Sequence, residues 1–392
     1  MSDRPKVSIR SNSKMNFLIL ITATIAAGLS QGMLLPVLSI LLEQKGVSSS
    51  LNGLNAAALY IGSFGMTLIA ERVLGAIGFK KLIASGISLV LVSLLLFPFF
   101  PGIKIWFVLR LLVGVGDAAI NYAAQLWVLL MTPAEHRGRN LSLYGMSYGL
   151  GFSLGPLGIS LLRFGQATPF VVLAFLFLLV LILAITILPD SRPDKVESGE
   201  SQVRRFGRCY SLAWFALIPA LLYGFMEASL NSNFPVYGLR IGYSTDQIAA
   251  LLPFAGVGGL LLQFPLGLWS DRFGRKKVLI LTGIGGGIAF ALLPLAGDHF
   301  KMTMVLLMIA GGLVGSFFSL GLSLAADILP RHLLPAANVV ASFHFSIGSI
   351  IGPGIGGLLM QIGWGGGIFG LMGALYITFG LLGLFFSPRQ KI

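Results

Sequence analysis

The chain has 392 residues, of which 56% are hydrophobic and only 10% are charged, and its mean hydropathy is +0.89. A soluble domain of this length cannot keep so much apolar surface away from water, so the composition indicates a membrane protein. The net charge of +13 is spread over the polar segments between apolar runs. This distribution is typical of contact with anionic lipid headgroups and argues against a nucleic-acid partner.

Twelve apolar segments of about 20 residues or more follow one another, which is the length a helix needs to cross a bilayer core of about 30 Å. The predicted spans are 17–42, 51–70, 82–100, 105–131, 141–162, 169–188, 214–239, 248–269, 278–295, 302–325, 336–360 and 368–386. We therefore expect an all-α membrane protein with twelve transmembrane helices.

Basic residues predict the orientation, because short loops rich in Lys and Arg stay in the cytoplasm. With both termini inside, 21 of the 27 basic residues lie on the cytoplasmic side, five lie outside and Arg110 lies within a span. The first apolar segment is too long for a signal peptide and lacks a small-residue cleavage site, so we interpret it as a retained helix. The sequence thus predicts a multi-pass protein of the cell membrane.

The one long polar segment inside the chain separates the first six spans from the last six. It runs from Pro189 to Arg208 and has the composition of a mobile linker. We therefore expect an N-terminal six-helix bundle at 1–188, a cytoplasmic linker at 189–210 and a C-terminal six-helix bundle at 211–392.

The two halves repeat a glycine-proline pattern. The fifth span carries Gly151, Gly155 and Pro156, and the eleventh carries Gly352 and Pro353, with the two Gly-Pro pairs 197 residues apart. Glycines at this spacing let helices approach closely, and a proline bends a helix. Because the pattern stands at the same place in each half, we expect two pseudo-symmetric bundles.

A second repeated element is the hairpin that follows the second span of each half. In the second half it contains Gly267, Asp271, Arg272, Gly274 and Arg275, which places one acid beside several cations at a tight turn. In the first half the equivalent positions of the Asp and the first Arg hold Gly75 and Ala76, whereas Gly78 and Lys80 are kept.

With these features the chain resembles the major facilitator superfamily of secondary transporters, over essentially its whole length. The fifth span is similar to the antiporter motif of the twelve-helix drug-efflux-like branch, and Arg110, Gly114 and Gly116 match the R-x-x-x-G-x-G motif of proton-coupled members. The departure is that the acidic turn is intact only in the second half. The resemblance implies two bundles around a central site, built from inverted repeats.

The resemblance also implies a latch. Asp271 is expected to dock at the start of the fifth span, near Arg139 and Asn140, where a helix N-terminus presents free N–H groups and a positive end. This contact would close the cytoplasmic side. The alternative interpretation is that the charges around Asp271 only determine topology.

A stripe of polar residues marks the fourth span. Its members, at helical spacing, are Arg110, Gly114, Asp117, Asn121 and Gln125. A charged stripe is costly against lipid and should face the protein interior. Arg110 and Asp117 are about 10 Å apart along the axis, too far for a direct ion pair.

The seventh span carries Tyr223, Glu227 and Asn231 in steps of four, and Gln31 of the first span stands 196 residues before Glu227. The first, fourth, seventh and tenth spans line the central site in the resembled family, so Asp117 and Glu227 are expected to face each other from opposite halves. Such a carboxyl can exchange a proton or pair with a cationic substrate. The alternative is that each acid has a packing role only.

Other chemistry finds little support. No nucleotide-binding loop is present, no two histidines stand at a metal-ligand spacing, and Cys209 is the only cysteine, so we expect no metal, no cofactor and no enzyme activity. His344 could titrate or pack. Tyr60, Tyr144 and Tyr148 could line the central cavity, although aromatic residues in membrane helices more often pack or lie at the interface, and Trp127 is interpreted as a residue of the interfacial belt.

We therefore predict a proton-coupled secondary active transporter that exports a small amphipathic or cationic compound. Its expected partners are that compound, protons and membrane lipid, and a monomer suffices because one chain contains both halves. The alternatives are a proton symporter or a facilitator for uptake of a small metabolite and, from another class, a lipid-handling membrane protein. Direction and substrate are not encoded in any single motif.

Overall fold

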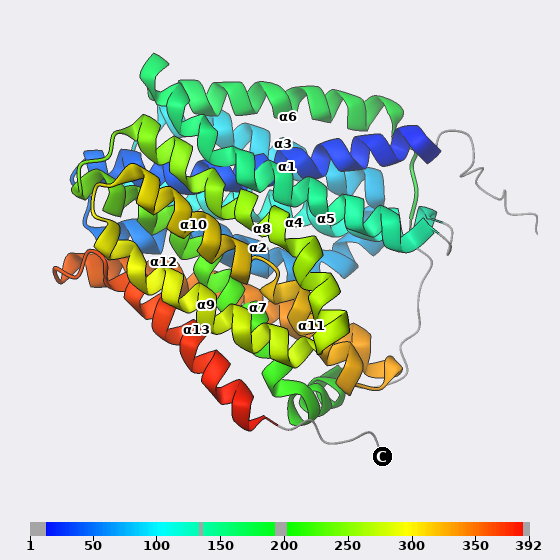
Figure 1. Ribbon diagram of the computed structural model, residues 1–392. Helices are drawn as coiled ribbons and strands as arrows, with labels where there is room; N and C mark the ends of the chain where they lie inside the picture. Colours follow the sequence, from blue (N-terminus) through cyan, green and yellow to red (C-terminus); the bar gives the residue numbers. More distant parts are fainter. Residues whose placement is uncertain (1–12, 133–135, 193–201, 387–392) are drawn as a thin grey trace, which may run out of the picture.

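A computed structural model describes residues 13–132, 136–192 and 202–386, and the regular secondary structure of these residues is entirely helical (Figure 1). The first half comprises α1 (Ser13–Gln44), α2 (Ser49–Ile77), α3 (Phe79–Phe99), α4 (Ile103–Met131), α5 (Arg137–Leu154), the 3-10 helix η2 (Gly155–Phe164) and α6 (Thr168–Ile187). The second half comprises α7 (Gln202–Arg240), α8 (Thr245–Phe273), α9 (Arg275–Leu292), η3 (Leu293–Ala296), α10 (Phe300–Val314), α11 (Phe317–Ile328), η4 (Arg331–Leu333), α12 (Leu334–Gln361) and α13 (Gly367–Phe385).

Ten helical stretches in the described residues are long and apolar enough to cross a membrane, with α10 and α11 counted as one stretch of 29 residues. The predicted fourth and fifth spans correspond to α4 and to α5 with η2, which are not among the ten. α4 is nonetheless 29 residues long, and α5 continues into a 3-10 helix at Gly155. The all-helical membrane architecture is confirmed, and the total of twelve spans stays a prediction.

The linker prediction needs a correction at its C-terminal end, because α7 already begins at Gln202. The backbone leaves helical geometry at Ala213, with φ −133° and ψ 26°, next to the predicted start of the span. The segment before this kink packs against the second half: the Cys209 thiol lies 3.7 Å from the carbonyl of Leu333, and the ring centroids of Phe206 and Phe343 are 6.2 Å apart. Buried side chains therefore extend the helix into the predicted linker, whose residues 193–201 lie outside the described ones.

Glycines bring pairs of helices into backbone contact in both halves. A Cβ atom at Gly151 would lie 2.3 Å from the carbonyl oxygen of Ile25, and one at Gly155 would lie 2.4 Å from the carbonyl carbon of Gly32. In the second half a Cβ at Gly352 would lie 2.4 Å from the Ser229 hydroxyl. The repeated glycines thus seat α5 on α1 and α12 on α7, as small residues do in membrane helices.

The two repeated hairpins end their first helices in the same way. Gly78 follows α2 with φ 86°, and Gly274 follows α8 with φ 93°. This left-handed region is unfavourable for residues with a Cβ atom, which explains the glycine in each turn. Ser244 and Gln247 form a capping box that starts α8, with hydrogen bonds of 3.2 and 2.9 Å.

The halves meet where α2 packs on α12 and α7, where α1 packs on α7, and where α5 and η2 pack on α8. The first residues of α1 and the last residues of α13 lie toward the same end of the bundle (Figure 1). We call this the Asp271 end, where α8 finishes, and the opposite end, where α1 and α7 finish, the Glu43 end. The charge distribution predicts that the Asp271 end is cytoplasmic.

Candidate functional site

The carboxyl of Asp117 is sealed inside the protein. Asp117 lies near the middle of α4 with 0% of its surface exposed, beside Ser30 and Gln31 of α1. Among the described residues neither Oδ1 nor Oδ2 has a hydrogen-bond partner. An ionised carboxylate without partners in such surroundings is costly, which makes this acid a candidate functional group rather than a packing residue.

Arg110 is equally buried but is tied to α1. Its Nη2 donates to the backbone carbonyls of Leu34 at 3.1 Å and Leu35 at 3.3 Å, whereas Nε and Nη1 have no partner among the described residues. No ion pair joins Arg110 and Asp117 in that part of the chain, in agreement with their expected separation. The cation therefore fastens α4 to α1 and leaves the carboxyl uncompensated.

The remaining members of the polar stripe have different surroundings. The side-chain carbonyl of Asn121 accepts a 3.1 Å hydrogen bond from the hydroxyl of Tyr144 on α5. A Cβ atom at Gly114 would lie 1.8 Å from the carbonyl oxygen of Leu59, so this glycine packs α4 onto α2. Gln125 is exposed and does not join the buried cluster. The stripe thus contributes Arg110, Asp117 and Asn121 to the interior.

In the second half of the chain, the buried acid is Glu227. It lies on α7 with 7% exposure, and its backbone carbonyl accepts a 2.9 Å hydrogen bond from Nδ2 of Asn231. The carboxyl is close enough to interact electrostatically with four phenols, which we call the tyrosine cluster: Tyr60 of α2, Tyr148 of α5, Tyr223 of α7 and Tyr376 of α13. Both halves of the chain therefore supply residues around one acid.

Further contacts surround the tyrosine cluster, and one of them crosses between the halves. Within the first half, the hydroxyl of Tyr148 donates to Oε1 of Gln31 at 2.7 Å. The ring of Phe345 on α12 lies 6.5 Å from that of Tyr60 of the other half and 6.0 Å from that of Tyr223, measured between centroids. The sequence named Tyr223 as a site residue and offered Tyr60 and Tyr148 as possible cavity residues, but single tyrosines on separate helices leave no pattern that predicts their grouping.

The expected docking of Asp271 on α5 stays a prediction. The Asp271 side chain is 68% exposed and lies 3.4 Å from Nη2 of Arg275, whose Nη1 lies 3.2 Å from Asp327 of α11. Arg139 is exposed, and Asn140 donates to the Thr132 hydroxyl at 3.2 Å. Among the described side chains, Arg275 is the ion-pair partner of Asp271, and it ties the acidic turn to its own half.

The other hairpin residues lie at the protein surface. Arg272 is exposed, with its guanidinium 5.4 Å from the centroid of the neighbouring Phe273 ring. A Cβ atom at Gly267 would meet no atom within 4 Å. Their surroundings therefore leave room for a partner at the Asp271 end.

Two side chains have clear structural roles. His344 is 8% exposed, with Nδ1 at 3.0 Å from the Leu217 carbonyl and Nε2 against the Tyr210 hydroxyl, so it joins α12 to α7. Trp127 is 5% exposed and stacks on Phe79 with 5.1 Å between centroids. The belt interpretation of Trp127 is therefore wrong, since the ring fills the interior between α3 and α4.

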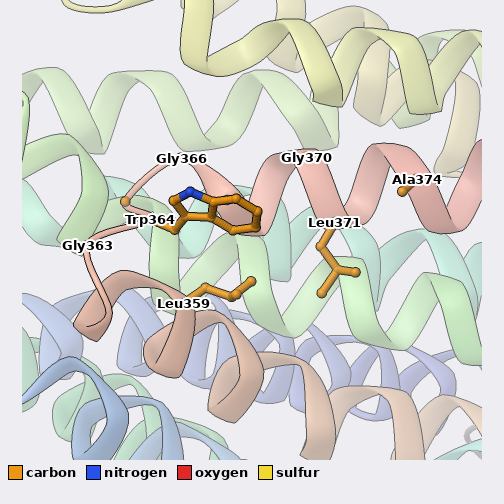
Figure 2. Close-up of a pocket in the computed structure, with 9 residues that line it drawn as sticks. Leu359, Gly363, Trp364, Gly366, Gly370, Leu371 and Ala374 are labelled. Carbon is orange, nitrogen blue, oxygen red and sulfur yellow. The ribbon is translucent and has the colours of Figure 1, made fainter.

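An open groove of about 650 Å³ lies between α12 and α13 at the Glu43 end (Figure 2). Its lining consists of glycines and the apolar side chains of Leu359, Trp364, Leu371 and Ala374. The groove contains no group that exchanges protons or pairs with a charge and lies apart from Asp117 and Glu227. In the described residues no three His, Cys, Asp or Glu side chains gather as a metal site would require.

The fold and the buried acids define a helical membrane protein with one buried carboxyl on α4 of the first half and one on α7 of the second. The sequence pattern of the Major Facilitator Superfamily matches residues 20–262 and again residues 209–392, so the chain belongs to this superfamily. It is a multi-pass protein of the cell membrane.

Individual relatives support the same assignment. The chain is 41% identical to an uncharacterized MFS-type transporter of Bacillus subtilis (strain 168), YfkF, covering 89% of this chain and 90% of the relative. It is 24% identical to Multidrug resistance protein 2 of the same organism, covering 90% of each. A crystal structure of a mutant of the nucleoside transporter NupG shares the fold, with a TM-score of 0.77, 13% identity and coverage of 94% of this chain and 99% of the other.

Proposed function

We propose that this chain is a proton-coupled secondary transporter that exports a small amphipathic or cationic compound by alternating access of its two halves, 1–188 and 211–392. Membership of the superfamily supports transport, and the multidrug resistance relatives support efflux. No catalytic family is indicated by the relatives.

The observation that carries the proposal is the sealed Asp117 carboxyl with two unpartnered oxygens. Such a group carries a proton while it is sealed and releases it when water or a cation reaches it. Since α4 is tied to α1 through Arg110, movement of these two helices changes access to the carboxyl. We therefore assign the transported proton to Asp117.

Glu227 and the tyrosine cluster supply the binding chemistry. Aromatic faces attract organic cations, and a carboxylate in the same place adds a charge of the required sign. Tyr60 and Tyr148 come from one half and Glu227 and Tyr223 from the other, so a bound compound touches both halves. This arrangement supports a site that is reached from either side of the membrane in turn.

The acidic turn around Asp271 is the part of the proposed transporter that closes one end of the central site. We assign Asp271 and Arg272, with the glycines of their turn, to closure of the Asp271 end in the conformation that opens the Glu43 end. Gly151, Gly155 and Gly352 form close helix contacts within each half. With Pro156 and Pro353, we assign them to the bending of the fifth and eleventh spans as the halves move.

Uptake of tetraphenylphosphonium, a lipophilic cation, into inverted membrane vesicles tests the direction and the coupling. An imposed proton gradient, acidic inside, should drive accumulation by the native protein and not by Glu227→Gln. Asp298→Asn, an exposed acid in a loop, should behave like the native protein. Equilibration without accumulation would identify a facilitator and contradict the proposal.

A further inference from the structure

At the Glu43 end, one cation gathers partners from three other helices. Arg240, the last residue of α7, donates from Nε to Oε1 of Glu43 at 2.8 Å and from Nη2 to the Ser49 hydroxyl at 2.5 Å. Its Nη1 donates to the backbone carbonyl of Met360 at 3.3 Å. A single guanidinium thus joins the ends of α1, α7 and α12 and the start of α2, using the several donors that distinguish Arg from Lys.

Glu43 and Arg240 lie at corresponding ends of the first helix of each half, one position out of register. They are 197 residues apart, whereas Gly46 and Gly242, the positive-φ glycines that follow these two helices, are 196 residues apart. The ion pair therefore joins the ends of α1 and α7, two helices that pack on each other across the contact between the halves. Opposite charges at this position attract when the halves are together at this end, and the contact is lost when they part.

The surroundings strengthen this ion pair compared with one on an open surface. The Glu43 side chain is 18% exposed and the Arg240 side chain 38%, and Oε2 of Glu43 is buried without a partner among the described residues. Partial burial reduces screening by salt, and charge-assisted hydrogen bonds are stronger than neutral ones. Separation of the halves at this end would therefore have to break several bonds at once.

No other ion pair joins the halves in the described part of the chain. The two remaining salt bridges, of Arg275 with Asp271 and with Asp327, both lie within the second half. Among the described side chains, the halves are thus linked by charge at the Glu43 end only. This difference indicates a conformation that is closed at the Glu43 end.

We propose that Glu43 and Arg240, with Ser49, form a lock that stabilises the conformation closed at the Glu43 end, and that the lock must break before that end can open. The inference rests on the alternating access of the proposed function. The lock determines the relative populations of the conformation closed at the Glu43 end and the conformation open at that end. Its residues contact neither the transported proton nor the compound.

Distances between spin labels test the lock without any substrate. In a Cys209→Ser background, labels at Lys104→Cys and Lys301→Cys report on the Glu43 end, and labels at Lys81→Cys and Lys277→Cys on the Asp271 end. All four lysines are exposed, with one of each pair in each half. The protein is reconstituted in lipid nanodiscs, and pulsed electron paramagnetic resonance gives each distance distribution.

Glu43→Gln and Arg240→Gln should each raise the population with a long distance at the Glu43 end, by about tenfold relative to the closed population, and shorten the distance at the Asp271 end. Ser49→Ala should raise the population with a long distance at the Glu43 end by a smaller factor. Arg163→Gln removes an exposed cation at the same end and should leave both distributions unchanged. The exchange Glu43→Arg with Arg240→Glu restores an ion pair and should shift the distribution back toward the closed form, which also guards against misfolded single variants.

Unchanged distributions at both ends in the two single variants would overturn the lock. Because no compound or proton gradient is present, a lock that responds as expected would stand even if coupled transport were absent. In that case only the proposed function would fail.

Discussion

The hydroxyl of Tyr148 on α5 donates a 2.7 Å hydrogen bond to the side-chain carbonyl of Gln31 on α1, beside Asp117. Gln31 is 5% exposed, so this bond replaces the water that its carbonyl would otherwise need. It joins two helices at the point where their backbones are already close through Gly28 and Gly151. The hydrogen bond thus holds α5 against α1 on one side of the buried Asp117 carboxyl.

Tyr148→Phe removes this bond and leaves a buried acceptor unpaired. The loss should lower the free energy of unfolding by about 1–3 kcal/mol, which a thermal unfolding assay in detergent detects as a lower midpoint. Tyr122→Phe is the matched control, because the half-buried Tyr122 hydroxyl has no hydrogen bond in the described residues. Equal shifts in the two variants would show that the bond to Gln31 contributes nothing.

Gly151→Ala should disrupt the seat of α5 on α1. The new Cβ would lie 2.3 Å from the carbonyl oxygen of Ile25, a backbone atom that cannot move aside alone. We expect a clear loss of folded protein and of transport. Gly149→Ala, on the same helix, places its Cβ where no atom lies within 4 Å and should be neutral or slightly stabilising, by up to about 1 kcal/mol. The yield of monodisperse protein distinguishes the two, and equal yields would contradict the packing.

Trp127→Ala should destabilise the protein by about 3–5 kcal/mol, because it leaves a cavity where the indole stacks on Phe79. Trp364→Ala removes the same side chain from a position that is 68% exposed and should change stability little. The midpoint of thermal unfolding measures both. If Trp364→Ala were the more damaging change, the distinction between interior and surface tryptophans would be wrong.

Much of the helical architecture could be predicted, since apolar length alone places most spans. The errors fall where tertiary packing outweighs local composition. The residues from Gln202 to Leu212 have the composition of a linker, yet the burial of Cys209 extends α7 through them. The tenth predicted span does form one apolar stretch, and only the interruption of its helix between α10 and α11 was not predicted; it lies near Gly315, which packs against the backbone of α8.

The sequence predicted the site best in its charged members. Asp117 and Glu227 are conspicuous because buried acids are rare in membrane helices, and both lie in the interior as expected. Of the tyrosine cluster the sequence named Tyr223 as a site residue, whereas the other members could not be told from packing residues, since tyrosines are common in membrane proteins. The Glu43–Arg240 pair was not predicted, because a charge at the end of a span is indistinguishable from one that sets topology.

The most direct test of the central claim is the release of protons from the purified protein in weakly buffered detergent solution as tetraphenylphosphonium is added. We expect the native protein and Asp298→Asn to release protons. Asp117→Asn should still bind the cation but should release no proton. Glu227→Gln should no longer bind the cation. Binding of the cation by the native protein without any proton signal, or release that persists in Asp117→Asn, would contradict the assignment of the transported proton to Asp117.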